Sequence, residues 1–183
     1  MKVMGVDPGP EESHLAYWDG IHVLYSRSYT NIDMLHILSM VEDDCLVAIE
    51  YITTMTFRVP QTVMDTAVWV GQFIYASRHR GPYTIKRLDI KKHICGRGNA
   101  KDTDIRNAIV GDLGELWSWQ DMIRDGEIVR KKSGRFKGEP KKERLLNPAY
   151  CEPVSGDQWQ ALAVAKTVYD LIKNGGELRR WHH

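Results

Sequence analysis

Acidic residues stand at three places in the sequence where short structural elements are expected to begin or end. Asp7 and Glu50 each follow a short apolar run, and Asp157 opens the last predicted helix. Gln160 lies three residues after Asp157, on the same helix face. Each acid alone is more often structural, since an Asp in a first helical turn interacts with the helix dipole. If the last helix packs over the sheet, three oxygen ligands meet, which suits Mg²⁺ or Mn²⁺ rather than zinc.

Charge is divided unevenly along the chain. The 25 Lys+Arg and 24 Asp+Glu residues give a formal net charge of +1, which argues against a nucleic-acid partner only if the charges are mixed. Residues 1–57 hold two basic and nine acidic residues, whereas residues 81–151 hold sixteen basic and ten acidic residues. Within the second segment, residues 130–144 carry eight basic residues against two acidic ones. This stretch is either a solvated loop or an arm that contacts phosphates.

The elements that must position these residues alternate in type. The strand-like runs are 2–6, 14–18, 21–27, 46–50 and 83–87. The helix-like runs are 32–41, 60–79, 89–94, 101–113 and, with Ser155 as its cap, a last helix that reaches residue 172. Asn31 is the expected cap of the first helix, and Asp19-Gly20 is a hairpin signal between the second and third strands. Hairpin strands followed by alternating helix and strand predict an α/β domain with a mixed sheet.

Length and composition indicate one globular domain that spans residues 1–183. Residues 125–150 lack apolar periodicity and predict a long loop or a partly ordered basic insertion in that domain. No apolar run is long enough for a membrane span, and the N-terminus does not read as a secretory signal. The three cysteines form no CxxC pair, which favours a reducing, cytoplasmic setting. Because no membrane span is expected, no membrane partner is expected either.

Five short motifs follow one another along the chain. They are VDPG at 6–9, VAIE at 47–50, GQ at 71–72, KKHICGRGNAK at 91–101 and DQWQALAVA at 157–165. The ordered set, from near residue 2 to about residue 172, resembles the RuvC-type Holliday junction resolvases of the RNase H-like nuclease superfamily. The basic stretch at 130–144 looks like an elaboration of the kind found in viral or phage relatives.

The resemblance implies an RNase H-like fold, with a mixed five-stranded sheet and helices on both faces. It implies a crossover junction endodeoxyribonuclease that uses Mg²⁺, for which Mn²⁺ substitutes, with two ions in each active site. Asp7, Glu50 and Asp157 take the catalytic positions, and Gln160 joins them as a metal ligand. Two-metal hydrolysis of a phosphodiester agrees with the ligand chemistry inferred from the residues alone. The implied partner is a four-way DNA junction, bound by a homodimer whose candidate interface is the helix at 60–79.

The resemblance also assigns a phosphate contact to Lys91. The remaining candidate DNA-binding residues are the nearby and downstream cations Lys92, Arg97, Lys101, Lys131, Lys132, Lys141 and Lys142. The implied cellular setting is the cytoplasm of a bacterium or of a phage-infected cell.

Three positions depart from the family pattern. Gln160 stands where the family has a second acid on the last helix, Asp102 stands where it has a lysine, and Thr53 stands where it often has an aromatic residue. The neutral Gln160 supports an alternative, a junction-binding module of the same fold with weak cleavage. A further alternative is an actin-like ATPase domain, because Gly5-Val6-Asp7-Pro8-Gly9 superficially resembles the phosphate loop of that superfamily.

Overall fold

The computed structural model describes most of the chain. The described residues are 1–53, 58–113, 117–121, 123–124, 127–128, 139, 142–146, 154 and 156–181. Within these ranges no helix is long and apolar enough to cross a membrane.

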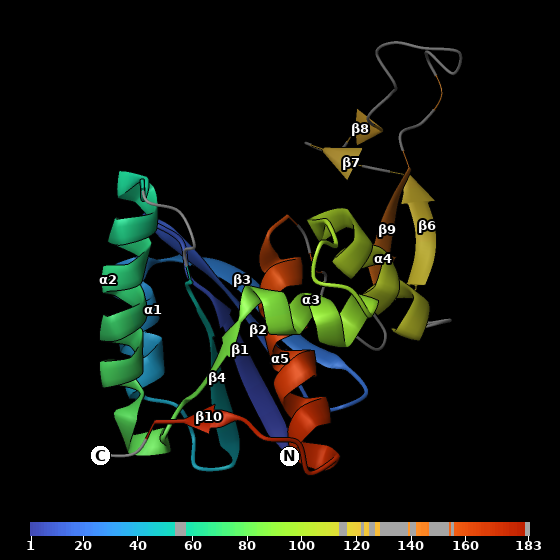
Figure 1. Ribbon diagram of the computed structural model, residues 1–183. Helices are drawn as coiled ribbons and strands as arrows, with labels where there is room; N and C mark the ends of the chain where they lie inside the picture. The colour runs from blue at the N-terminus through green and yellow to red at the C-terminus, as the bar shows by residue number, and fades with distance from the viewer. Residues whose placement is uncertain are drawn as a thin grey trace.

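A mixed sheet forms the centre of the molecule (Figure 1). In sequence order its strands are β1 (Lys2–Asp7), β2 (Glu12–Trp18), β3 (Val23–Thr30), β4 (Cys45–Tyr51), β5 (Tyr83–Lys86) and β10 (Arg179–Arg180). They lie side by side in the order β10-β5-β4-β1-β2-β3. β1 pairs antiparallel with β2 and parallel with β4, and β4 pairs parallel with β5. The carboxyl ends of β1, β4 and β5 therefore meet at one edge of the sheet, which is where the candidate site lies.

Helices cover both faces of the sheet, as expected (Figure 1). α1 (Asn31–Ser39) and α2 (Gln61–Ala76) lie on one face. α3 (Arg87–Cys95), α4 (Asp102–Leu113) and α5 (Gln158–Lys173) lie on the other. A short 3₁₀ turn at Arg78–Arg80 follows α2.

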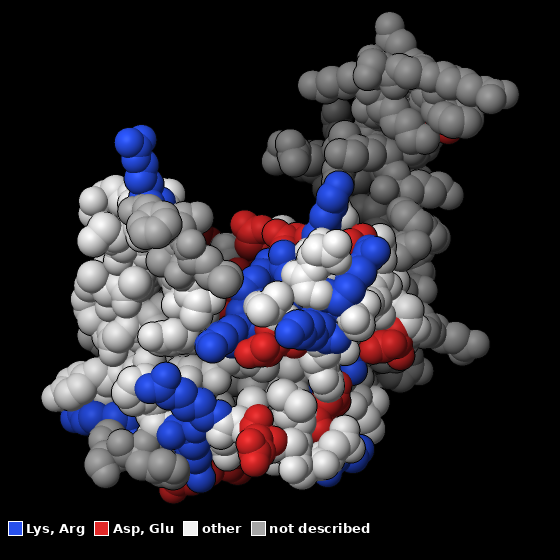
Figure 2. All heavy atoms as spheres, viewed as in Figure 1, with Lys and Arg blue, Asp and Glu red and all other residues white. Residues whose placement is uncertain are grey.

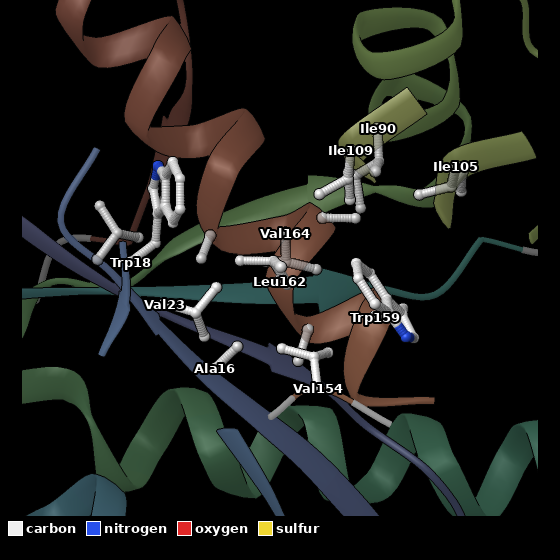
Figure 3. Packing of buried hydrophobic residues seen from close by; sticks show 14 of the residues in the cluster. Ala16, Trp18, Val23, Ile90, Ile105, Ile109, Val154, Trp159, Leu162 and Val164 are labelled. Carbon is white, nitrogen blue, oxygen red and sulfur yellow. The ribbon is translucent and has the colours of Figure 1, made fainter. Parts of the chain in front are cut away.

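Alternation along the strands divides the core into two layers. Val3 and Ala48 face α5, whereas Met4, Val47 and Ile49 face α1 and α2. Such period-2 alternation is what a strand covered on both faces by apolar helices shows. Figure 3 shows the first layer, in which Leu162 and Val164 of α5 lie among core side chains of the sheet and of α3 and α4.

α5 lies unusually close to β1, and Gly5 makes this approach possible. A Cβ at Gly5 would overlap the carbonyl oxygen of Ala161 and would lie 2.6 Å from the backbone nitrogen of Ala165. No side chain fits between the two backbones at this point. The crossing fixes the N-terminal end of α5, and with it Asp157, relative to the end of β1.

The structure corrects several expectations about element ends. The side-chain oxygen of Thr30, not that of Asn31, caps α1 by accepting from the Asp33 backbone N–H at 3.2 Å. The Asn31 side chain is instead buried, donating to the Gly9 carbonyl and accepting from the Ser13 hydroxyl. α5 begins at residue 158 with Asp157 as its N-cap residue, while the expected cap Ser155 lies outside the described residues.

Two further differences concern strands. The central sheet has six strands rather than the expected five, because the two-residue strand β10 pairs with the edge of β5. Short strands also stand in or beside the segment expected to be a long loop. β6 (Trp117–Asp121) pairs with β9 (Lys142–Leu146), and β7 (Ile123–Arg124) pairs with β8 (Glu127–Ile128).

Candidate active site

Two carboxylates meet at the carboxyl end of the central strands. Asp7 is the last residue of β1, and Glu50 is the penultimate residue of β4. The register pairs Val6 with Ile49, so that the next residue on each strand is one of the two acids. Glu50 is 9% exposed, and Asp7 is half-buried. The sheet therefore places the two strand-end acids side by side, as the sequence pattern predicts.

Burial and mutual repulsion make this pair electrostatically unusual. Two causes raise the pKa of Asp7 well above its ordinary value. The larger is burial away from water, and the next is the negative charge of Glu50. Burial also raises the pKa of Glu50, against the opposing effects of the Arg87 guanidinium and of a hydrogen bond with the Asp7 side chain. The two carboxyl groups favour a shared proton over two negative charges. A divalent cation would relieve the same repulsion.

The N-terminal end of α5 brings the other two candidate ligands to this edge. The negative charge of Asp157 contributes to the raised pKa of Asp7, so Asp157 lies within electrostatic reach of the strand acids. Its own side chain is 79% exposed. Gln160, one turn into the helix, is 6% exposed, and its buried side-chain oxygen Oε1 has no hydrogen-bond partner among the described residues. An unsatisfied buried oxygen is costly, and metal coordination is one way to satisfy it.

His14 is a neighbour of the site that the sequence reasoning missed. It is paired with Asp7 across the β1–β2 ladder, which places both side chains on one face of the sheet. Its Nε2 lies 3.9 Å from Oδ2 of Asp157, and its Nδ1 is 2.8 Å from the Ser28 hydroxyl. Gln158 accepts a hydrogen bond from Ser26 at 2.9 Å and so ties the start of α5 to the same hairpin. The seven histidines show no ligand spacing, so only the strand pairing could have found this one.

Arg87 is the second missed residue, and it makes the shortest charged contact in the site. It is the first residue of α3, directly after β5. One guanidinium nitrogen donates to Oε2 of Glu50 at 2.9 Å, and the other donates to Oδ1 of Asp102 at 2.7 Å. A single arginine after a strand belongs to no motif. The pairing of β5 with β4 alone brings it beside Glu50.

The predicted DNA-binding cations of the first cluster lie on α3 and in the loop that follows it. Lys91 is half-buried, and its Nζ lies 4.0 Å from Asp102, next to Arg87. Lys92, Arg97 and Lys101 are exposed. Figure 2 shows lysine and arginine side chains gathered over α3, with acidic side chains beside them. Arg87 and Lys91 place positive charge beside the acid pair, and positive charge is what phosphate binding requires.

The second predicted cluster is outside what can be described. Lys131, Lys132 and Lys141 lie outside the described residues, and Lys142 is the first residue of β9.

The candidate ligands are oxygen atoms, which suit a hard cation, but the side chains that carry them do not meet at one point in this structure. Among the described residues, no three His, Cys, Asp or Glu side chains stand close enough to hold an ion as placed. The exposed Asp157 side chain has to turn inward to join Asp7 and Glu50. The buried acid pair and the unpartnered oxygen of Gln160 nevertheless fit Mg²⁺ or Mn²⁺, which take carboxylate and amide oxygens.

Comparisons with known proteins extend over nearly the whole chain. Neither a protein-family model nor a curated protein sequence matches. Solved structures do match, and two of them are each 16% identical to this chain, covering 98% of this chain and 99% of the other. They are a structure of Thermus thermophilus RuvC, with a TM-score of 0.59, and T. thermophilus RuvC in complex with a Holliday junction substrate, with a TM-score of 0.61. The fold expected from the motifs is thereby confirmed, and the chain has the fold of RuvC.

Proposed function

We propose that this chain is a metal-dependent, structure-specific DNA endonuclease that resolves four-way junctions and acts on other branched DNA. The observation that carries the proposal is the buried Asp7–Glu50 pair at the carboxyl edge of a sheet with the RuvC fold. A similar fold bound to a Holliday junction supports branched DNA as the substrate class.

Asp7, Glu50 and Asp157 would hold the cation, with the Gln160 oxygen as a neutral ligand. Divalent ions held there would supply an activated water and would stabilise the charge on the leaving oxygen of the phosphodiester. The protein's part is to hold the acids on rigid elements and to present the cations of α3 to the phosphates. Lys91 would be one of these cations, because it lies 4.0 Å from Asp102, the acid that Arg87 also contacts.

We further propose that the active form is a homodimer joined through α2. Met64, Val68 and Tyr75 form an apolar stripe on the exposed face of this helix, and each is more than half exposed. Gly71 lies between them along the helix with open space above it. A two-fold dimer would place two sites against opposed strands of a two-fold symmetric junction.

The proposal also covers the chain's organisation and setting. Residues 1–183 form one nuclease domain with a basic insertion at about 125–150, and its place of action is the cytoplasm. The basic insertion adds positive charge for DNA, as its composition suggests.

The deciding experiment measures cleavage by the purified full chain. Labelled four-way, flap and duplex DNA are incubated with and without Mg²⁺ or Mn²⁺. We expect metal-dependent cutting of the branched substrates. Asp7→Asn and Glu50→Gln each remove a ligand charge, so each should lower the cleavage rate by about 10²-fold or more while metal-independent junction binding persists.

A matched control is Asp112→Asn, because Asp112 pairs with Lys166 at 3.4 Å on the outer side of α4 and α5. This variant should cut at the wild-type rate. Full cleavage by either site variant would refute the assignment of the acids.

A junction-binding module is the second candidate, and Gln160 is the observation that favours it. A neutral amide in place of a carboxylate weakens the hold on a divalent ion. Metal-independent junction binding without cutting of any substrate would establish this alternative in place of the nuclease.

A further inference from the structure

Arg87 occupies an unusual position, between the Glu50 carboxylate of the site and the carboxylate of Asp102. Its side chain is 27% exposed, and its two terminal nitrogens bond different acids at the same time. Glu50, on one side, is a proposed metal ligand and is 12% exposed at its side chain. Asp102, on the other side, is the first residue of α4 and is 63% exposed. The guanidinium thus forms a bridge from the buried ligand to an acid at the surface.

This bridge places a fixed positive charge against the Glu50 carboxylate, at 2.9 Å. Arginine stays charged at all ordinary pH values, and its planar fork suits two carboxylates better than a lysine would. The charge of Arg87 opposes the burial that raises the pKa of both Asp7 and Glu50. In the metal-free protein, Arg87 therefore offsets part of the cost of burying the acid pair.

Any ion that binds Glu50 has to share this carboxylate with Arg87. Like charges in a half-buried pocket repel strongly, so the guanidinium and a divalent ion compete for the same negative charge. Asp102 offers the guanidinium a second partner within reach, at 2.7 Å. An arginine attracted toward Asp102 leaves Glu50 freer for the ion.

We propose that Arg87 is a positioning residue that competes with the divalent ion for Glu50, and that Asp102 favours metal binding by holding Arg87 away from it. The inference rests on the proposed metal site at Asp7 and Glu50. It adds a regulating pair, Arg87 and Asp102, that lies outside the ligand set.

The test measures binding of Mn²⁺ to the purified full chain without DNA, by titration calorimetry and by the electron paramagnetic resonance signal of the free ion. Arg87→Met removes the competing charge and should tighten Mn²⁺ binding by about fivefold or more. Asp102→Asn releases the guanidinium toward Glu50 and should weaken binding by a similar factor. Arg87→Lys keeps the charge and should stay closer to the wild type than Arg87→Met does.

A double variant separates the bridge from a general charge effect. If Asp102 acts through Arg87, then Asp102→Asn should weaken binding much less in the Arg87→Met background than in the wild type. Lys86→Met and Asp104→Asn are matched controls, since Lys86 is exposed next to Arg87 and Asp104 pairs with Arg97 instead. Both controls should bind Mn²⁺ within about twofold of the wild type.

Several results would overturn the inference. Weaker or absent Mn²⁺ binding in Arg87→Met would mean that Arg87 orients Glu50 for the ion rather than competing with it. Tighter binding in Asp102→Asn would contradict the role of Asp102, and this variant changes an exposed residue, so it remains informative if Arg87→Met fails to fold. Because the readout uses no DNA, these failures are distinct from failure of the wild-type chain to cut junctions, which would refute the proposed function.

Discussion

At the scale of single residues, the buried acid pair makes metal-free stability depend on pH. The folded-state pKa of Asp7 is raised, chiefly by burial. The stability that this group contributes is therefore fully present below its unfolded pKa of about 3.9 and is lost as the pH rises through the folded value. Ionising Asp7 therefore lowers the stability of the metal-free fold.

Asp7→Asn should accordingly raise the melting temperature of the metal-free protein at about pH 7.5, by roughly 2–4 °C for each kcal/mol of relief. The difference from the wild type should shrink as the pH falls toward the ordinary carboxyl range. Added Mg²⁺ should stabilise the wild type more than the variant, because the variant lacks a ligand charge. Thermal melts across the pH range, with Asp112→Asn as the control, check this. Identical melting temperatures for wild type and Asp7→Asn in metal-free buffer would show that ionisation of Asp7 does not lower the stability of the fold.

The residues that the sequence identified differ in kind from those it missed. Asp7 and Glu50 could be found because each ends an apolar run, and strand ends in an α/β sheet meet at one edge. Arg87 and His14 could not, because their places depend on which strands pair. Strand order is a property of the whole sheet, and no local pattern encodes it.

At the scale of elements, α2 carries an apolar stripe that the protein's own core does not use. Met64 is 54% exposed and Val68 is 60% exposed, while Thr66, Val70 and Phe73 on the other side of the helix are buried. A helix with one face packed on the sheet and a second apolar face in solvent is typical of an interface. The Trp69 indole N–H, on the same helix, donates to the carbonyl of Pro10 at 3.1 Å, next to the loop that follows Asp7.

Met64→Glu and Val68→Glu should therefore convert the proposed dimer to a monomer, since each would bury a charge in the interface. Sedimentation velocity at several protein concentrations measures the change. Met40→Glu is the control, because Met40 is 73% exposed at the end of α1 and lies away from the stripe. A wild type that stays monomeric throughout, or a dimer indifferent to both glutamates, would remove α2 as the interface.

The sequence predicted well the elements that have a clear hydrophobic pattern. It did not predict the elements that form only through tertiary contacts. β1, β4 and α5 follow from apolar runs and helical spacing. β10 has only two residues and forms because it pairs with the exposed edge of β5, which no propensity signals. The start of α1 was displaced by one residue, because the Asn31 side chain is taken up by buried hydrogen bonds to the hairpin.

At the scale of the whole molecule, the small net charge is the sum of an acidic segment and a basic segment. The acidic first segment supplies Asp7 and Glu50, whereas the basic second segment supplies the cations of α3 and the residues of the insertion. On the face shown in Figure 2, lysine and arginine side chains gather over α3 with acidic side chains beside them. A bound divalent ion would neutralise part of the acidic side and would shift the local potential toward a favourable one for DNA.

The contribution of the basic insertion can be measured from the salt dependence of junction binding. Replacing Lys131, Lys132, Lys141 and Lys142 with glutamine should weaken metal-independent binding and flatten the plot of log affinity against log salt concentration. The slope should fall by about 0.9 for each phosphate that the variant no longer neutralises, because fewer counterions are released on binding. Lys173→Gln, an exposed lysine at the opposite end of α5 from the site, should leave the slope unchanged. Fluorescence anisotropy over a salt series measures both variants. An unaltered slope in the fourfold variant would assign DNA binding to the α3 cations alone and would make the insertion a solvated loop.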